Sequence, residues 1–254
     1  FHKFSDQRVA PFCEHFGVCG GCKWQHIGYE TQLSFKRQQV VDQFERIAKV
    51  PIPEVRPIIG SDNSQYYRNK LDFTFSNNRW LTRDEIDSEK QFERNALGFH
   101  IPKRFDKIVD INHCHLQGGL SNDIRNRLRQ FALEQLVSFY DIREQTGVLR
   151  NLIIRTSSTE ETMVIVQFGE NVPVEIKKIM DFLQLTFPQI TSLLYIVNLK
   201  KNETFNDLEV ITYSGLDYIT EKMEDLEQLR ALEHGGKIKV GLIEDHVFGV
   251  DTPE

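Results

Sequence analysis

Apolar residues recur at helical spacing in three stretches of the chain. Residues 28–48 and 120–139 both place apolar side chains at the three- and four-residue intervals that are typical of an amphipathic helix. Residues 173–186 repeat the spacing, and Pro173 suits the first turn of a helix. We therefore expect three helices.

Alternating and continuous apolar runs predict strands before, between and after these helices. The predicted strands are 66–76, 95–100, 107–113, 149–158, 162–169, 192–199 and 208–213. The charged stretch 84–95 is typical of an exposed loop. From residue 120 the expected order is α-β-β-α-β-β, which indicates an α+β fold with helices packed on an antiparallel sheet.

Composition limits the class of protein. With 254 residues, 40% of them hydrophobic, the chain can bury a sizeable core. The net charge of −6 excludes a strongly basic coat for nucleic acid, although residues 1–70 carry ten Lys and Arg against seven Asp and Glu. No apolar run approaches the length of about 20 residues that spans a membrane. The chain begins at Phe1 rather than Met, from which we expect a missing N-terminus.

Four cysteines carry the clearest chemical signal. Cys13, Cys19 and Cys22 lie within ten residues, and Cys114 stands alone. The two glycines between Cys19 and Cys22 let the backbone wrap closely around an inorganic centre. Four thiolates suit a zinc ion or an iron–sulfur cluster, and free or redox-active thiols are the third interpretation. A triplet with one distant cysteine favours the cluster, because structural zinc sites usually show two C-x2-C pairs.

The segment Arg8–His26 resembles the cluster-binding segment of the bacterial 23S ribosomal RNA (uracil-C5)-methyltransferases. The runs Tyr67–Lys70 and Asp110–Gln117 also match that family, and the resemblance covers residues 8–223. It implies a [4Fe-4S] cluster held by Cys13, Cys19, Cys22 and Cys114.

The same resemblance implies a cytoplasmic protein with ribosomal RNA as its partner, and neither a membrane nor DNA. Cations and one aromatic ring lie near the cysteines in the sequence, as in surfaces that hold single-stranded RNA. The candidate RNA contacts are Lys23, Trp24, Lys36, Arg37, Arg68 and Lys70. A solvated helix face is the competing interpretation of Lys36 and Arg37, and Trp24 could instead cover the cluster.

The family's chemistry also needs S-adenosylmethionine, a nucleophilic cysteine and a general base. All four cysteines are assigned to the cluster, and no G-x-G-x-x-G loop is present, so we expect no catalytic residue and no S-adenosylmethionine site in this chain. The expected domains are a cluster segment with its helix (1–50) and a central α+β RNA-positioning domain (51–223), without the family's doubly wound catalytic domain.

The expected function is therefore that of a fragment of a 23S rRNA uracil-C5-methyltransferase, carrying the cluster and the RNA-binding portion and inactive alone. The alternative is a non-catalytic RNA-binding module with a structural zinc or iron–sulfur site. Metal content separates the zinc form of this alternative from the enzyme fragment.

Residues 224–254 form an acidic tail that does not continue the resemblance. The run Gly249-Val-Asp-Thr-Pro resembles the C-terminal part of the CMP-3-deoxy-manno-octulosonate synthetases. We interpret this as a chimeric chain with a seam near residues 224–227, and a divergent tail is the alternative. Asp251 alone is a poor magnesium site, so no metal is expected there.

Overall fold

The computed structural model of the protein describes residues 3–52, 54–88 and 90–221. Residues up to Thr220 form one compact unit. The predicted tail at 224–254, its seam and Asp251 lie outside the described residues. Among those that are described, no helix combines the length and apolarity that a membrane span requires.

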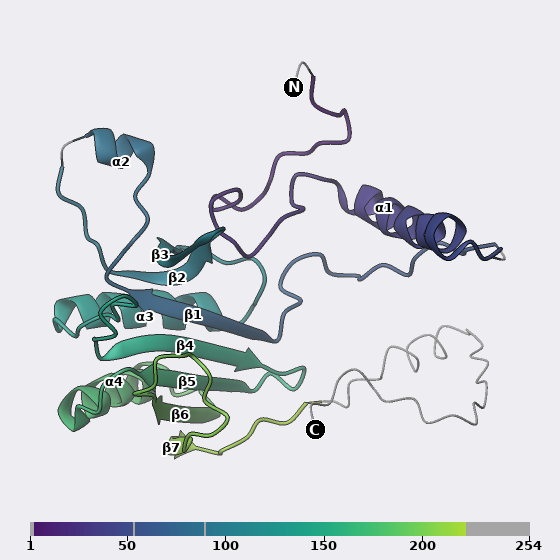
Figure 1. Ribbon diagram of the computed structural model, residues 1–254. Helices are drawn as coiled ribbons and strands as arrows, with labels where there is room; N and C mark the ends of the chain where they lie inside the picture. Colours follow the sequence, from purple (N-terminus) through teal and green to yellow (C-terminus); the bar gives the residue numbers. More distant parts are fainter. Residues whose placement is uncertain (1–2, 53, 89, 222–254) are drawn as a thin grey trace. The chain divides into compact units, whose positions relative to one another are not determined.

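A seven-stranded sheet organises this unit, in the order β3-β2-β1-β4-β5-β6-β7 (Figure 1). Its strands are β1 (Lys70–Ser76), β2 (Ala96–Ile101), β3 (Arg104–Asp110), β4 (Leu149–Thr156), β5 (Thr162–Phe168), β6 (Ser192–Val197) and β7 (Ile211–Gly215). The α-helices are α1 (Tyr29–Asp42), α2 (Arg83–Asp87), α3 (Ser121–Glu134) and α4 (Pro173–Thr186), and a π-helical turn (Gln43–Ala48) follows α1.

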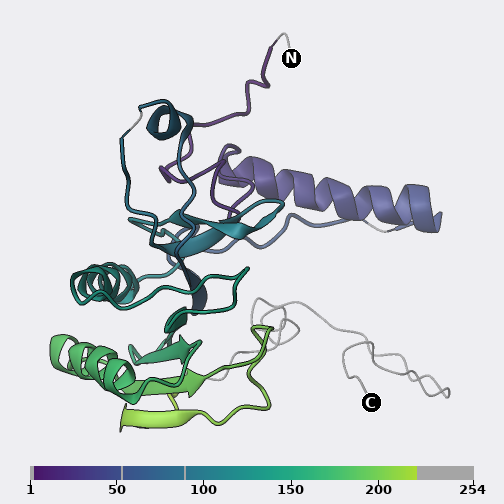
Figure 2. The same ribbon diagram turned by 60° about the vertical axis from the view of Figure 1, so that its left-hand side comes forward.

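Helices α3 and α4 lie on the same side of the sheet (Figure 2). The main core forms beneath them, where Phe73, Leu152 and Ile179 are fully buried. A second, smaller cluster around Ile165 and Ile196 is packed against partly buried apolar residues that follow β6 in the sequence. Both faces of the sheet are therefore covered over β5 and β6, which explains why these strands are continuously apolar.

The predicted strands and helices are confirmed in position, and α4 has the predicted bounds. The sheet is mostly antiparallel, as expected, and among its described strands the one parallel pair is β5 with β6. The crossover through α4 returns the chain to the end of the sheet where β5 began, so the next strand runs in the same direction. The expected loop at 84–95 also contains α2, which a capping box between Thr82 and Glu85 stabilises.

The amphipathic helix predicted at 28–48 is present, but none of its residues is buried. Only its first half has a partner. Tyr29 and Leu33 pack against Gly60, and Arg37 donates to the carbonyl oxygen of Val55. The chain segment that returns to β1 thus runs beside α1 (Figure 1), and the later apolar residues Val40, Phe44 and Ile47 remain exposed.

We predict that Phe73→Ala lowers the free energy of unfolding by about 3–5 kcal/mol. Phe73 is fully buried, its ring lies 4.9 Å from that of Phe99, and the Arg125 guanidinium sits 5.0 Å above it. The control is Phe105→Ala, because that ring is 65% exposed. If chemical denaturation showed the same loss of unfolding free energy for Phe73→Ala and Phe105→Ala, this account of the core would be contradicted.

Candidate cluster site and adjoining pocket

All four cysteines line one cavity. Cys114 is buried and Cys13, Cys19 and Cys22 are half-buried; all four are free thiols. The apolar part of the wall includes Phe16, Phe99, Ile111 and Leu116. The structure thus brings together the residues that the sequence predicted as one ligand set.

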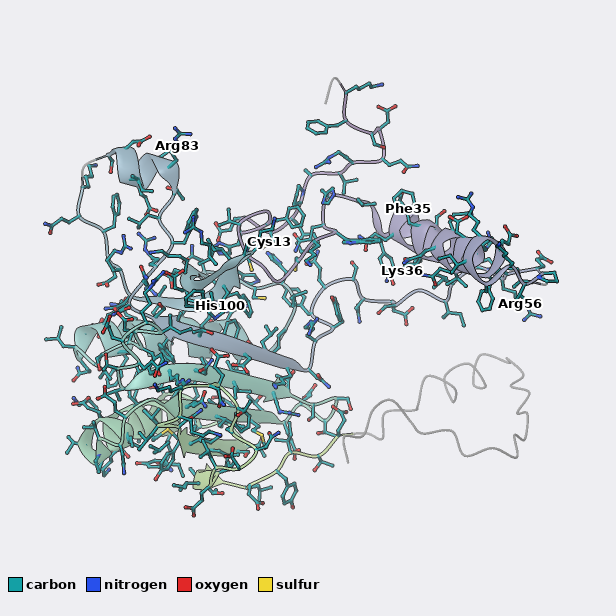
Figure 3. The ribbon with its side chains drawn as sticks, in the orientation of Figure 1. Cys13, Phe35, Lys36, Arg56, Arg83 and His100 are labelled. Carbon is teal, nitrogen blue, oxygen red and sulfur yellow. The ribbon has the colours of Figure 1, made fainter. Side chains whose placement is uncertain are left out.

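The cysteine loop is docked on the edge of β2 through Gly20. Its amide donates to the His100 carbonyl oxygen over 3.1 Å. A Cβ atom at Gly20 would lie 2.6 Å from that oxygen, so only glycine permits this approach. Figure 3 shows Cys13 at the end of the sheet that carries His100, away from Lys36 on α1.

Helix α3 holds the loop that carries Cys114. Asn122 accepts a hydrogen bond from the Cys114 amide (2.8 Å) and donates to the Cys114 carbonyl oxygen (3.1 Å). Arg125 is fully buried and donates to the carbonyl oxygens of Ile111 (3.1 Å) and Asn112 (2.8 Å). Burial lowers the pKa of Arg125 to about 10, which leaves the guanidinium charged at neutral pH. These contacts fix the Cys114 backbone without using its sulfur.

Histidines connect the two loops rather than adding to the cysteine set. His15 Nε2 accepts a hydrogen bond of 3.0 Å from the Asn112 amide. Burial lowers the pKa of the His15 imidazole. The Tyr66 hydroxyl lies 3.0 Å from His113 Nε2 and 3.3 Å from His115 Nδ1. The side chains that flank the cysteines therefore have structural partners of their own.

Burial raises the pKa of the Cys13, Cys19 and Cys114 thiols in this cavity. The pKa of Cys19 is raised to about 11. Neighbouring cysteines raise the pKa of Cys19 further, since each thiolate disfavours the next. Four clustered thiolates in this cavity therefore need a positive centre to offset their mutual repulsion.

Within residues 3–52, 54–88 and 90–221, no three His, Cys, Asp or Glu side chains are arranged to hold a metal ion. The cysteines converge on one cavity without forming the tight tetrahedron of a single-ion site. This geometry gives no metal site by itself.

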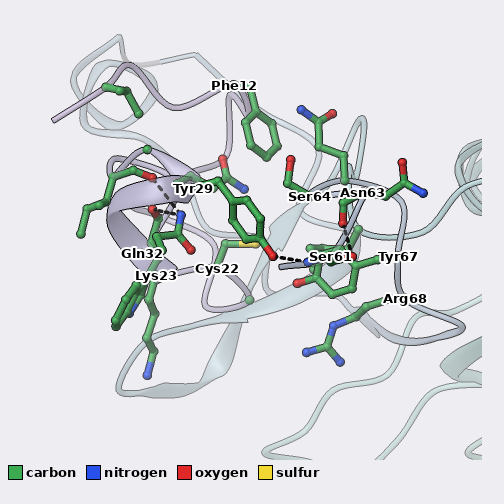
Figure 4. A pocket seen from close by; sticks show the side chains of 18 of the residues that line it. Phe12, Cys22, Lys23, Tyr29, Gln32, Ser61, Asn63, Ser64, Tyr67 and Arg68 are labelled. Carbon is green, nitrogen blue, oxygen red and sulfur yellow. Dashed lines mark hydrogen bonds between the residues drawn. The ribbon is translucent and has the colours of Figure 1, made fainter. Parts of the chain in front are cut away.

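A second and larger pocket adjoins the cysteine cavity (Figure 4). Its volume is about 560 Å³, within the range of about 300–1,000 Å³ for small-molecule sites. It is lined by the cysteine loop, the first turns of α1 and the segment 61–68. Cys22 and Leu116 belong to both linings, so the two sites share a wall.

Four of the six predicted RNA contacts line this pocket: Lys23, Trp24, Lys36 and Arg68. Arg37 and Lys70 do not. Arg37 is occupied by its hydrogen bonds to the Val55 carbonyl oxygen, and Lys70 is the first residue of β1.

Sequence reasoning missed the pocket residues Tyr29 and Tyr67. Tyr29 lies within the predicted amphipathic helix 28–48, where an aromatic residue is typical of a packed position. Tyr67 directly precedes the predicted RNA contact Arg68, and that adjacency is the available signal.

The relatives found by comparison with known proteins are named RNA methyltransferases. No family model matches the chain. It is 51% identical to an uncharacterized RNA methyltransferase of Bacteroides thetaiotaomicron, over 89% of this chain and 51% of that protein. A Porphyromonas gingivalis relative of the same name is 49% identical, over 87% of this chain and 49% of the relative. The chain therefore spans about half the length of the curated relatives it matches.

One solved structure is also similar. It is the Pyrococcus abyssi tRNA (uracil-54, C5)-methyltransferase in complex with S-adenosyl-L-homocysteine. The TM-score is 0.57 and the identity 28%, over 87% of this chain and 45% of that chain.

These findings correct two expectations from the sequence. The expected fold class, in which the methyltransferase's catalytic domain is absent, is contradicted by the alignment of 87% of the chain with a solved methyltransferase. The expected function, an inactive fragment or a non-catalytic RNA-binding module, is contradicted because relatives named RNA methyltransferases match 89% of the chain. The names of these relatives and of the similar structure support neither an iron–sulfur cluster nor a chimeric chain.

We predict that Arg125→Met lowers the free energy of unfolding by about 3 kcal/mol, because it removes the Arg125 donor from the buried Ile111 carbonyl oxygen and one of two donors from the Asn112 carbonyl oxygen. Arg127→Met on the same helix is the control, since that exposed side chain lies only over the Phe187 ring. Arg127→Met should lower the free energy of unfolding by less than about 1 kcal/mol. Denaturation curves that coincide for the two variants would contradict the role of Arg125.

Proposed function

We propose that this protein is an S-adenosylmethionine-dependent RNA (uracil-C5)-methyltransferase that carries a [4Fe-4S] cluster on Cys13, Cys19, Cys22 and Cys114. The observation that carries the proposal is the convergence of these four side chains, from two distant parts of the sequence, on one cavity. The likeness to named RNA methyltransferases supports the reaction class. Ribosomal RNA is the proposed substrate on the sequence resemblance.

The donor set of this cavity fits a cluster. In a [4Fe-4S] cluster each cysteine binds a different iron atom, and four cysteines from two distant segments of the chain line this one cavity. The positive iron centre would offset the mutual repulsion of four thiolates in one cavity.

The cluster's proposed role is structural. It would join the loop of Cys13, Cys19 and Cys22 to the loop after β3, and its binding would be coupled to folding. Among the described residues, this junction is also crossed by the hydrogen bonds of His15 and Gly20 and by the edge contact of the Phe12 and His115 rings, whose centroids lie 5.1 Å apart.

S-adenosylmethionine is the methyl donor that the likeness implies, and the described residues do not fit it. The β5-α4-β6 crossover has one glycine in its loop, and a Cβ atom at Gly169 would lie 2.7 Å from the Tyr140 ring. The pocket beside the cysteines is lined by Lys23, Lys36 and Arg68, which would repel a sulfonium. No step of the methyl transfer is assigned to these residues.

We predict about four iron and four sulfide per chain after anaerobic purification. Each of Cys13→Ser, Cys19→Ser, Cys22→Ser and Cys114→Ser should lose most of that iron. His113→Gln is the matched control, because His113 flanks Cys114 and contacts Tyr66 instead of supplying a ligand. One zinc and no iron, or iron that survives all four substitutions, would contradict the cluster.

Deletion of the gene should remove 5-methyluridine from one position of cellular RNA. Nucleoside mass spectrometry of ribosomal and transfer RNA, followed by mapping of the lost position, makes the measurement. Loss from ribosomal RNA supports the full proposal, and loss from transfer RNA corrects the substrate. Unchanged 5-methyluridine in both RNA classes, with the deletion verified, would refute the proposed activity.

A further inference from the structure

The pocket beside the cysteine cavity has the charge of an anion site. Its lining includes Lys23, Lys36 and Arg68 and contains no Asp or Glu, in a chain whose net charge is −6. In the described part of the chain none of these three cations forms an ion pair, whereas cations such as Arg79 and Arg129 do. Three unpaired cations facing one cavity indicate a ligand that brings negative charge.

The same pocket presents aromatic rings to solvent. Phe12, Trp24 and Tyr67 are 45%, 41% and 57% exposed, although rings of this size are usually packed into the core. Aromatic faces beside cations are the surface on which unpaired bases stack while their phosphates are neutralised. The pairing of rings with cations favours a nucleotide over a simple anion such as phosphate.

Hydrogen-bonding groups complete the lining. Asn63, Ser64 and Gln65 also line the pocket, and within the described residues their side chains make no hydrogen bond. Amide side chains can both donate to and accept from the edge of a base. The pocket therefore offers stacking, charge and edge recognition together.

The pocket is built before any ligand enters. Gln32 donates to the carbonyl oxygens of Trp24 (3.2 Å) and Ile27 (2.8 Å), which ties α1 to the cysteine loop. The Tyr29 hydroxyl accepts a hydrogen bond of 2.7 Å from the Ser61 amide (Figure 4). This bond fixes the segment 61–68, which forms the opposite wall of the pocket. A preformed site loses less conformational entropy on binding.

We propose that this pocket binds one unpaired nucleotide of the RNA substrate, with its base stacked on Trp24 or Tyr67 and its phosphate held by Arg68 and Lys36. A base within a duplex cannot offer its face to a ring, so the pocket selects a single-stranded or extruded segment. This inference rests on the proposed function. It adds a site for an RNA nucleotide in a pocket to which no methyl donor is assigned.

The fluorescence of Trp24 itself reports whether RNA enters the pocket. The chain has two tryptophans, so Trp80→Phe leaves Trp24 as the only one. In that background a ten-nucleotide single-stranded RNA should quench the tryptophan emission, and a ten-base-pair RNA duplex should bind more weakly by fluorescence anisotropy. Binding without a change in Trp24 emission would place the RNA elsewhere and overturn the proposal.

Substitutions of pocket residues test whether the RNA binds at this pocket. Tyr67→Ala should weaken single-stranded RNA binding about tenfold. Tyr218→Ala is the matched control, because Tyr218 is also 57% exposed and lies outside the pocket lining. Arg68→Gln should reduce the slope of log Kd against log salt by about 0.7. Equal effects of Tyr67→Ala and Tyr218→Ala would overturn the proposal.

The two proposals fail separately. If Trp24 reports no RNA while gene deletion still removes 5-methyluridine, the methyltransferase stands and the nucleotide pocket is wrong. If the pocket binds RNA and 5-methyluridine is unchanged, the proposed activity is wrong and the binding site stands.

Discussion

The junction between the cysteine loop and the loop after β3 is the constraint on which both sites depend. Bringing Cys22 to Cys114 closes a long stretch of chain, and that closure costs conformational entropy. Contacts that offset this cost include the Gly20 amide on the His100 carbonyl oxygen, His15 on the Asn112 amide, and the edge contact of the Phe12 and His115 rings. A bound cluster would add four strong ligand bonds at this junction.

The shared wall connects the cysteine cavity to the proposed nucleotide pocket. Cys22 lines both spaces, so a change in the position of its backbone moves Lys23 and Trp24 as well. A loop held by a cluster would keep this wall rigid without any redox chemistry. The positions of the pocket's cations would then depend on the inorganic centre, although none of them contacts it.

Local patterning predicted the elements and one of the two sites. The hydrophobic periodicity located the strands and α4, because burial on the sheet enforces the pattern directly. The parallel pairing of β5 and β6 followed from tertiary packing of α4, which spacing alone does not encode. The four cysteines were recognisable because metal ligation demands specific residue types.

The nucleotide pocket was only partly predictable. Lys23, Trp24, Lys36 and Arg68 were found by charge and aromatic character. Tyr67 was missed, because the fold of the segment 61–68 against α1, not its sequence pattern, turns this side chain toward the pocket.

X-ray absorption at the iron edge of the anaerobically purified protein tests the central claim most directly. The account predicts an iron site with sulfur as its only first-shell ligand and iron neighbours in the next shell, as in a four-cysteine [4Fe-4S] cluster. Iron bound by nitrogen and oxygen without iron neighbours, or zinc bound by the cysteines in place of iron, would contradict it.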